Sequence, residues 1–169
     1  MKRWVKGSVA MGAALALGLS AAQTPDAKTS REVFQDWSMT CLEKAQARSC
    51  LANHVIKNAG GRPVAVISLR QAGADQGARV EFALPLMLDL TQPMGLSIDG
   101  KAMSAMPYST CSAKACFVIR SGDDLLFDRL RVGREAVLTL NTHAGKTVRL
   151  RASLLGLGDA WRALGKQKS

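Results

Sequence analysis

The stretch 97–120, SIDGKAMSAMPYSTCSAKACFVIR, decides the fold because a tight turn and two cysteines interrupt a run of short apolar segments. Asp99 and Gly100 form a dipeptide that tolerates a positive φ at both positions, which a two-residue hairpin turn requires. Cys111 and Cys116 flank a second short loop, SAKA. The stretch therefore predicts a β-hairpin followed by two strands on either side of a cysteine-bounded loop.

Before this stretch, short segments alternate between apolar and polar residues, which is typical of strands with one buried face. Four apolar residues of 33–41 fall on one parity and three polar residues on the other, so we expect one half-buried strand there. Its inward residues are Val33, Trp37, Met39 and Cys41. The polar stretch 42–49 that follows predicts a loop.

Further strands are expected at 50–57, 64–69 and 79–84. The second of these is apolar on both faces, which predicts a central strand. Prolines bracket the next apolar stretch, 85–93, which makes a regular central strand there improbable. We expect a crossover loop whose Leu86 and Leu88 lie over the core.

Two segments towards the C-terminus predict helical structure. Leucines four residues apart replace the alternation in 121–131, where Ser121 is the expected cap and Gly133 the expected stop. The tail predicts one helical turn that has Asp159 as its cap and docks through the apolar pair Trp161 and Leu164. The fold therefore combines many strands with one short helix and a C-terminal helical turn.

Between these two segments, 135–140 and 146–154 predict a hairpin whose second strand alternates cleanly. Its expected inward residues are Val148, Leu150, Ala152 and Leu154. Its expected outward residues are Thr147, Arg149, Arg151 and Ser153.

The first residues have the organisation of a signal peptide, with the cations Lys2, Arg3 and Lys6 before an apolar run. That run, 7–19, is shorter than the roughly 20 residues of a membrane-spanning helix, so we expect cleavage after Ala22 and no permanent anchor. No later stretch is long enough and apolar enough to span a bilayer. The expected organisation is a signal peptide (1–22), a flexible leader (23–31), a single domain (32–165) and a basic tail (166–169).

Export favours disulfides for the four cysteines, because thiols oxidise in the compartments to which proteins are exported. Two disulfides are expected, and the sequence alone allows three pairings. The two hairpin-like loops favour nearest-neighbour pairing, Cys41 with Cys50 and Cys111 with Cys116. The first pair is too widely spaced for a structural zinc site, and a Cys-x-x-Cys redox motif is absent.

The formal charge is +10, and removal of the three signal-peptide cations leaves a mature protein near +7. Export and a single tyrosine argue against a base-stacking nucleic-acid surface. Acidic glycans, anionic headgroups and other envelope components are better electrostatic partners. The charge also has an ordinary explanation in solubility.

The residues predict no catalytic site. His54 and His143 are the only histidines, and they fall on an expected strand and an expected turn with no ligand beside them in sequence. Asp123 and Asp124 point about 100° apart on a helix, so they do not form a facing carboxylate pair. The G-x-S-x-G elbow of many serine hydrolases is absent. We therefore expect a protein that is not an enzyme and needs neither a cofactor nor a metal.

One surface is a candidate for binding. If the last strand and the tail dock together, their outward cations gather in a patch that suits sulfate, phosphate or carboxylate groups. These cations are Arg149, Arg151, Arg162, Lys166 and Lys168. The alternative is an ordinary solvated face, because charged residues also blunt exposed strands.

With the tryptophan and both cysteine pairs placed, the chain resembles the invasion-associated locus B family of exported bacterial proteins. The matching features, in chain order, are Asp36-Trp37, Cys41, Cys50, the hairpin 95–100, Cys111, Cys116, Asp123-Asp124 and 153–164. The resemblance implies an all-β sandwich of immunoglobulin-like architecture, exported to the periplasm or the cell surface, with some members linked to host-cell entry. It implies no known enzyme activity and transfers no ligand residues to this chain.

We expect an exported, non-enzymatic binding protein of the bacterial envelope with a role in host-cell interaction or invasion. Its expected partner is an envelope component, an acidic glycan or a protein surface. The alternative is a periplasmic accessory protein, an inhibitor or assembly factor, which an exposed apolar patch near 86–94 would support. A deep pocket that holds His54 beside a carboxylate would instead favour a hydrolase.

Overall fold

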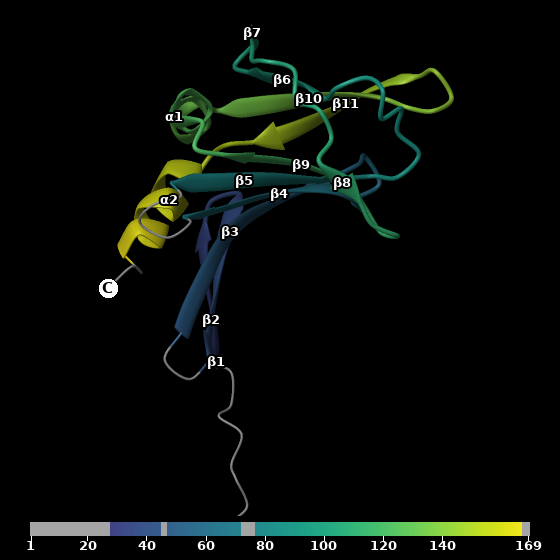
Figure 1. Ribbon diagram of the computed structural model, residues 1–169. Helices are drawn as coiled ribbons and strands as arrows, with labels where there is room; N and C mark the ends of the chain where they lie inside the picture. The colour runs from purple at the N-terminus through teal and green to yellow at the C-terminus, as the bar shows by residue number, and fades with distance from the viewer. Residues whose placement is uncertain (1–27, 45–46, 72–76, 167–169) are drawn as a thin grey trace, which may run out of the picture.

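The computed structural model describes residues 28–44, 47–71 and 77–166. In these residues two antiparallel sheets are stacked, and two helices cover one end of the stack (Figure 1). The expected β-sandwich with two disulfides is confirmed. The predicted signal peptide, 1–22, lies outside the described residues.

Seven of the described strands form the larger sheet, in the order β1-β2-β3-β4-β5-β9-β8. They are β1 (Lys28–Phe34), β2 (Trp37–Lys44), β3 (Ala47–Lys57), β4 (Pro63–Gln71), β5 (Ala78–Leu84), β8 (Thr110–Cys111) and β9 (Cys116–Ser121). The strands β1 to β5 form an antiparallel meander, because consecutive strands with short connections tend to pair. As predicted, β4 lies at the centre of the sheet.

The inner face of the larger sheet is apolar, as the alternation in the sequence predicts. Ile67 and Leu69 of β4 are fully buried, and so are Val80, Phe82 and Leu84 of β5. These side chains belong to the same buried cluster as the inward residues of the smaller sheet. The core therefore lies between the two sheets.

The smaller sheet contains four described strands, in the order β11-β10-β6-β7. They are β6 (Gly95–Ile98), β7 (Lys101–Ala102), β10 (Glu135–Asn141) and β11 (Thr147–Ser153). Asp99 and Gly100 have φ angles of 49° and 78°, which confirms the predicted two-residue turn between β6 and β7.

The Asp99 side chain fastens this turn to the start of β10. Its Oδ1 accepts hydrogen bonds from the backbone N–H groups of Arg134 and Glu135, each at 3.0 Å. The bond from Glu135, followed by that from Arg134, lowers the pKa of Asp99 because both favour the charged carboxylate. The turn is thereby held against β10 at neutral pH.

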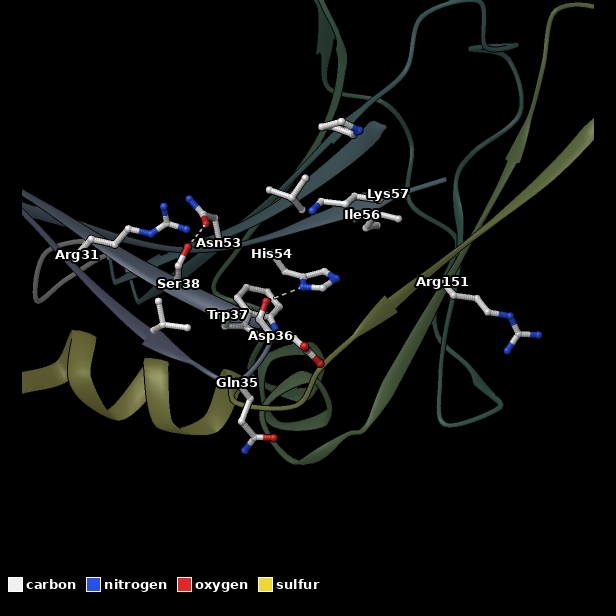
Figure 2. A pocket seen from close by; sticks show the side chains of 13 residues that line it. Arg31, Gln35, Asp36, Trp37, Ser38, Asn53, His54, Ile56, Lys57 and Arg151 are labelled. Atoms are coloured by element: carbon white, nitrogen blue, oxygen red, sulfur yellow. Dashed lines mark hydrogen bonds between the residues drawn. The ribbon is translucent and has the colours of Figure 1, made fainter. Parts of the chain in front are cut away.

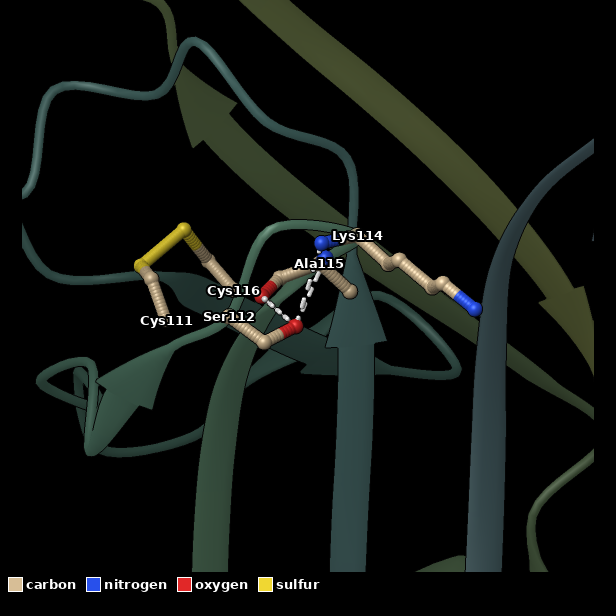
Figure 3. The surroundings of a disulfide bond; sticks show 5 residues. All are labelled: Cys111, Ser112, Lys114, Ala115 and Cys116. Atoms are coloured by element: carbon tan, nitrogen blue, oxygen red, sulfur yellow. Dashed lines mark hydrogen bonds between the residues drawn. A yellow bond between two sulfur atoms is a disulfide. The ribbon is translucent and has the colours of Figure 1, made fainter.

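Both predicted disulfides are present, and each joins residues that lie directly opposite in an antiparallel pair. The Cα atoms of Cys41 and Cys50 are 4.1 Å apart, and those of Cys111 and Cys116 are 4.0 Å apart. Figure 3 shows the second disulfide, beside which the Ser112 hydroxyl oxygen accepts backbone N–H bonds inside the loop. The predicted nearest-neighbour pairing is confirmed.

The stretch 33–41 is a hairpin, and the prediction of a single strand there is wrong. Strand β1 ends at Phe34 and β2 begins at Trp37, with a turn in which Gln35 has a φ of 50°. A two-residue turn shifts the side-chain parity by one, so Val33 lies on the face opposite to Trp37 and is 68% exposed.

The polar segments on either side of this hairpin are also more ordered than predicted. Strand β1 begins at Lys28, inside the expected flexible leader. The expected loop 42–49 is largely strand, because β2 continues to Lys44 and β3 begins at Ala47. Backbone pairing between neighbouring strands orders these residues without requiring an apolar side chain.

Helix α1 (Asp124–Val132) lies where the sequence predicts a helix, but its cap is different. The side chain of Asp123, and not of Ser121, accepts a hydrogen bond from the backbone N–H of Leu126 at 3.0 Å. A carboxylate at this position also interacts favourably with the positive end of the helix dipole. As predicted, Gly133 follows the last turn.

Helix α2 (Leu157–Lys166) is a full helix where a single turn was predicted. It starts before Asp159, which lies in the first turn and is not the cap. Leu157, Ala160 and Leu164 form a buried stripe at helical spacing, and α2 packs against β1 to β4 and against α1. This packing stabilises the additional length.

The turn between β1 and β2 is joined to the connection between β11 and α2. The Trp37 Nε1–H donates to the backbone carbonyl of Ser153 at 3.0 Å. Gly156 has a φ of 90°, and a Cβ atom there would lie 1.9 Å from the carbonyl oxygen of Phe34. Only glycine fits at this approach. We call the contact of Trp37, Phe34, Ser153 and Gly156 the edge joint.

Candidate functional site

The structure places the predicted basic residues in two sets. Arg149 and Arg151 are exposed and lie on one face of β11, as the alternation predicts. Arg151 Nη1 donates to Glu135 Oε1 at 3.0 Å on the neighbouring strand. Because this pair is exposed, it contributes little to stability, but it neutralises one of the two cations of β11.

The other predicted cations belong to the C-terminal helix. Arg162 and Lys166 lie one turn apart on α2, and Arg162 pairs with Asp159. Lys168 lies outside the described residues. The strand and the helix pack mainly against different elements, since β11 contacts β10 and β3 whereas α2 contacts β1 to β4 and α1.

An open hollow of about 630 Å³ lies beside the turn between β1 and β2 (Figure 2). We call it the histidine groove, because His54 lines it together with Asp36, Trp37, Ser38 and residues of β1, β3 and β11. His54 Nδ1 is 2.8 Å from the backbone carbonyl oxygen of Asp36, and its ring lies 5.7 Å from that of Trp37. These contacts fix the orientation of the imidazole.

The groove is lined by a serine, a histidine and an aspartate, which are the residue types that the hydrolase alternative requires. Ser38 Oγ donates to Asn53 Oδ1 at 2.7 Å across the β2–β3 pair. Neighbouring strand residues point to opposite faces, so His54 lies on the face away from Asn53 and Ser38. His54 contacts a backbone carbonyl of Asp36 and not its carboxylate. The described groove therefore does not assemble a nucleophile with its base.

A second hollow is almost entirely apolar and lies at the end of the sandwich away from the helices. Its volume is about 400 Å³, and we call it the loop pocket. It is lined by Pro85, Leu86, Met87, Leu88, Leu140, Thr142, His143, Ala144 and Val148. Leu88 is buried as predicted, but Leu86 is 42% exposed and Met87 is 75% exposed, so only one of the two predicted leucines lies over the core.

The wall of the loop pocket is held by backbone hydrogen bonds. The backbone N–H of His143 donates to the carbonyl of Met87 at 2.9 Å, and that of Asp89 donates to the carbonyl of Asn141 at 2.9 Å. Met87 has a φ of 66°, which is uncommon for a residue with a side chain. Such strain persists only where surrounding contacts enforce it, and it is concentrated at functional sites.

The next residues strengthen this arrangement. The Asp89 carboxylate accepts hydrogen bonds from Thr91 Oγ1 at 2.6 Å and from the Thr91 backbone N–H at 3.0 Å. The side-chain bond, and then the backbone bond, lowers the pKa of Asp89. The loop is thus fixed by charged and backbone interactions while its apolar side chains remain available. A preformed apolar hollow of this kind is typical of a binding site.

Sequence reasoning found one side of the loop pocket and missed the other. An exposed apolar patch near 86–94 is the feature that the accessory-protein alternative requires, and Leu86 and Met87 supply it. His143 and Val148 complete the pocket from the β10–β11 hairpin, and Val148 is 37% exposed although its parity is inward. The alternation predicts which face of the sheet a side chain lies on, but not whether another layer covers that face at the end of the strand.

The described ranges 28–44, 47–71 and 77–166 also bear on metal binding and on membrane crossing. No group of three or more His, Cys, Asp or Glu residues there is placed to hold a metal ion. Nor does any helix in this part of the chain have the length and apolar character that crossing a bilayer demands. The two disulfides fit an exported protein.

The chain is similar to the proteins of one known family. The family model described as "Invasion associated locus B (IalB) protein" matches residues 37–165, which include both disulfides and all of α2 except its last residue. The chain belongs to the IalB family. Two IalB relatives, invasion protein B homologs of Brucella abortus strains 2308 and 9-941, are each 29% identical to this chain over 138 residues. The alignment covers 79% of this chain and 78% of each relative.

A solved structure has the same IalB fold. The crystal structure of invasion associated protein b from Bartonella henselae matches with a TM-score of 0.70 at 22% sequence identity. The match covers 81% of this chain and 95% of that chain. The predicted family resemblance is therefore confirmed, and the shared architecture extends over nearly the whole of the related structure.

Proposed function

We propose that this IalB protein is an exported, non-enzymatic binding protein that recognises another protein through the loop pocket. The observation that carries the proposal is the apolar hollow of about 400 Å³ that opens beside Leu86 and Met87. The partner is a protein of the bacterial envelope or of the host-cell surface. The invasion-associated names of the relatives support the second source.

The pocket chemistry favours a protein over a sugar or a nucleotide. Carbohydrates and phosphates are recognised by several polar and charged groups, whereas most of the pocket wall is apolar and only Thr142 and His143 are polar residues. Burial of one leucine-sized side chain in such a pocket contributes roughly 1.5–3 kcal/mol. The exposed Met87 adds an adaptable contact at the rim, since methionine accommodates partners of varied shape.

The non-enzymatic part of the proposal is supported by the histidine groove. Ser38 and His54 lie on opposite faces of the larger sheet, and the His54 Nδ1 contact is a backbone carbonyl. We infer that the groove stabilises the turn between β1 and β2. The protein then acts by binding in the periplasm or at the cell surface.

The test is site-specific photo-crosslinking in living cells. It uses two variants of this protein, one with a benzophenone amino acid at position 87 and one with the same amino acid at position 125. Leu125 is a matched control, because it is 64% exposed and lies on α1 at the other end of the sandwich (Figure 1). We expect a discrete adduct from position 87 alone. Equal adducts from both positions, or none from position 87, would contradict the proposal.

The partner identified in the adduct is then purified for a binding measurement. We expect Met87→Glu to weaken its affinity at least about tenfold, whereas Leu125→Glu leaves it unchanged. Binding that survives high salt agrees with an apolar contact. Binding that disappears at high salt and is insensitive to Met87→Glu favours the basic residues and an acidic partner instead.

A further inference from the structure

Strand β11 is an edge of the smaller sheet, and its pairing shows which backbone groups are free. The N–H of Thr142 donates to the carbonyl of Lys146 at 2.8 Å, and the N–H of Leu154 donates to the carbonyl of Arg134 at 2.9 Å. Hydrogen-bonded pairs alternate along an antiparallel ladder, so the even-numbered residues of β11 bond to β10. Thr147, Arg149 and Arg151 therefore direct their N–H and C=O groups to the outer edge.

Ser153 supports this assignment and marks where the free edge ends. Its carbonyl points away from β10 and accepts the Trp37 Nε1–H at 3.0 Å in the edge joint. Beyond this point β11 is no longer available. Between Thr147 and Arg151, the described residues provide no hydrogen-bond partner for the outward backbone groups of the odd positions.

The free part of β11 carries two exposed arginines on its outward face, but nothing on this strand blocks the edge itself or its inward face. Natural edges carry a proline, a bulge or an inward charge that prevents pairing with another chain. The sequence TVRLRAS of β11 contains no proline, and its register with β10 is uninterrupted from Thr147 to Ser153. Its inward side chains at the open end, Val148 and Leu150, are apolar. The edge is therefore competent to accept another strand.

The same edge is continuous with the loop pocket. Val148 is a residue of β11 and also a wall of the pocket, and its opposite neighbour on β10 is Leu140, which is fully buried. A strand added beside β11 places its inward side chains next to Val148, in line with Leu140. One added strand can thus use the free backbone groups and the apolar pocket together.

The outward face sets the charge of the added strand. Arg151 is paired with Glu135, and Arg149 has no ion-pair partner among the described residues. An acidic side chain directly opposite Arg149 on the added strand would complete a cross-strand pair. The preferred occupant therefore alternates apolar residues facing inward with acidic residues facing outward.

We propose that an extended segment of the partner protein, with alternating apolar and acidic residues, binds as an additional strand on β11 and inserts an apolar side chain into the loop pocket. This proposal rests on the proposed function and assigns its binding mode. Main-chain hydrogen bonds supply affinity in such β-augmentation, and the pocket and Arg149 supply selectivity.

The direct test uses the full exported protein labelled with ¹⁵N and a synthetic peptide of alternating valine and glutamate, VEVEVEV. We expect saturable NMR shifts at the amides of Thr147, Arg149 and Arg151, and slower hydrogen exchange at those three positions. We expect the matched peptide VKVKVKV to bind at least about tenfold more weakly, because its cations oppose Arg149. Absence of saturable shifts at the three amides, or equal binding of both peptides, overturns the proposal.

A backbone variant separates this proposal from the proposed function. Arg149→Pro removes an outward N–H that makes no bond to β10, so an edge strand tolerates it, whereas Arg149→Ala removes the charge and keeps the N–H. We expect peptide binding to be lost in R149P and only weakened in R149A. Capture of the crosslinked partner that depends on Met87 but is unchanged in R149P overturns the strand-addition mode and leaves the proposed function intact. Should R149P fail to fold, the amide shifts of the unsubstituted protein decide the question.

Discussion

The two sheets each end in a long exposed edge strand, but the two edges are built differently. Strands β1 and β11 have the same length and similar exposure. On β1 the residue opposite the buried Met39 is Glu32, which places a charge on the inward face of the edge. On β11 the corresponding inward residues are Val148 and Leu150.

This difference teaches that exposure alone does not identify a binding edge. An inward carboxylate makes strand addition unfavourable, because the incoming chain would have to desolvate it. Strand β1 is thus protected against accidental pairing by an inward charge, whereas β11 has charges only on its outward face and lies beside a preformed apolar pocket. The contrast can be tested at three places. These are the edge joint, the disulfide of the β2–β3 hairpin next to β1, and the inward carboxylate of Glu32.

The largest effect is expected at the edge joint, where the two edges meet. Trp37 is 1% exposed, so Trp37→Ala should lower the free energy of unfolding by about 3–5 kcal/mol through the cavity that it leaves. Trp37→Phe keeps most of the packing but removes the hydrogen bond to Ser153, so a smaller loss is expected. Urea denaturation of the purified protein measures both losses. Equal losses would show that the hydrogen bond, and not the packing, dominates the joint.

An intermediate effect is expected from the disulfides. Removal of either bridge by paired alanine substitution should cost roughly 2–3 kcal/mol by the chain-entropy model. The Cys41–Cys50 bridge should cost slightly more than Cys111–Cys116, because its sequence separation is 9 and that of the other is 5. Denaturation midpoints of the two double variants measure the difference.

The location of the bridges sharpens the comparison of the edges. Cys41 lies on β2, the only described partner of β1 in the sheet. Loss of Cys41–Cys50 should therefore accelerate hydrogen exchange in β1, whereas loss of Cys111–Cys116 should not. If the β1 amides exchange at the same rate in both variants, the Cys41–Cys50 bridge has no special role in holding this edge.

The smallest effect on stability, and the most specific effect on association, is expected from Glu32→Val. The change should alter the free energy of unfolding by less than about 0.5 kcal/mol, because the side chain is exposed. It also removes the inward charge of β1, so we expect self-association to increase with concentration in sedimentation velocity. Arg31→Val is the control, because its side chain lies on the other face. Unchanged sedimentation of E32V would remove the basis for calling β1 protected.

The sequence predicted those parts of the fold that depend on local chemistry. The Asp99-Gly100 turn needs two positive φ angles, and few other dipeptides supply them. The strands of the β10–β11 hairpin follow directly from alternation. The disulfide pairing follows from loops that are short enough for each cysteine to face its nearest neighbour.

The wrong predictions of side-chain burial have a common physical cause. The alternation of apolar and polar residues along a strand carries no information about where a turn reverses the chain or which parts of a sheet another layer covers. The turn at Gln35 contains neither glycine nor proline, so Val33 was assigned to the wrong face. Leu86 and Val148 have the composition of core residues, but no other layer covers them at the end of the sandwich. Both belong to the loop pocket, whose two walls come from segments that only the folded chain brings together.

The edge joint also constrains when the molecule can finish folding. Trp37 and Ser153 are 116 residues apart in sequence, yet the hydrogen bond between them holds the first hairpin to the last strand. Contacts of such long range form late, because the intervening chain has to be ordered first. Under the export proposed above, a chain that crosses the membrane from its N-terminus exposes its first hairpin long before Ser153 of its last strand, so the domain closes only when translocation is nearly complete.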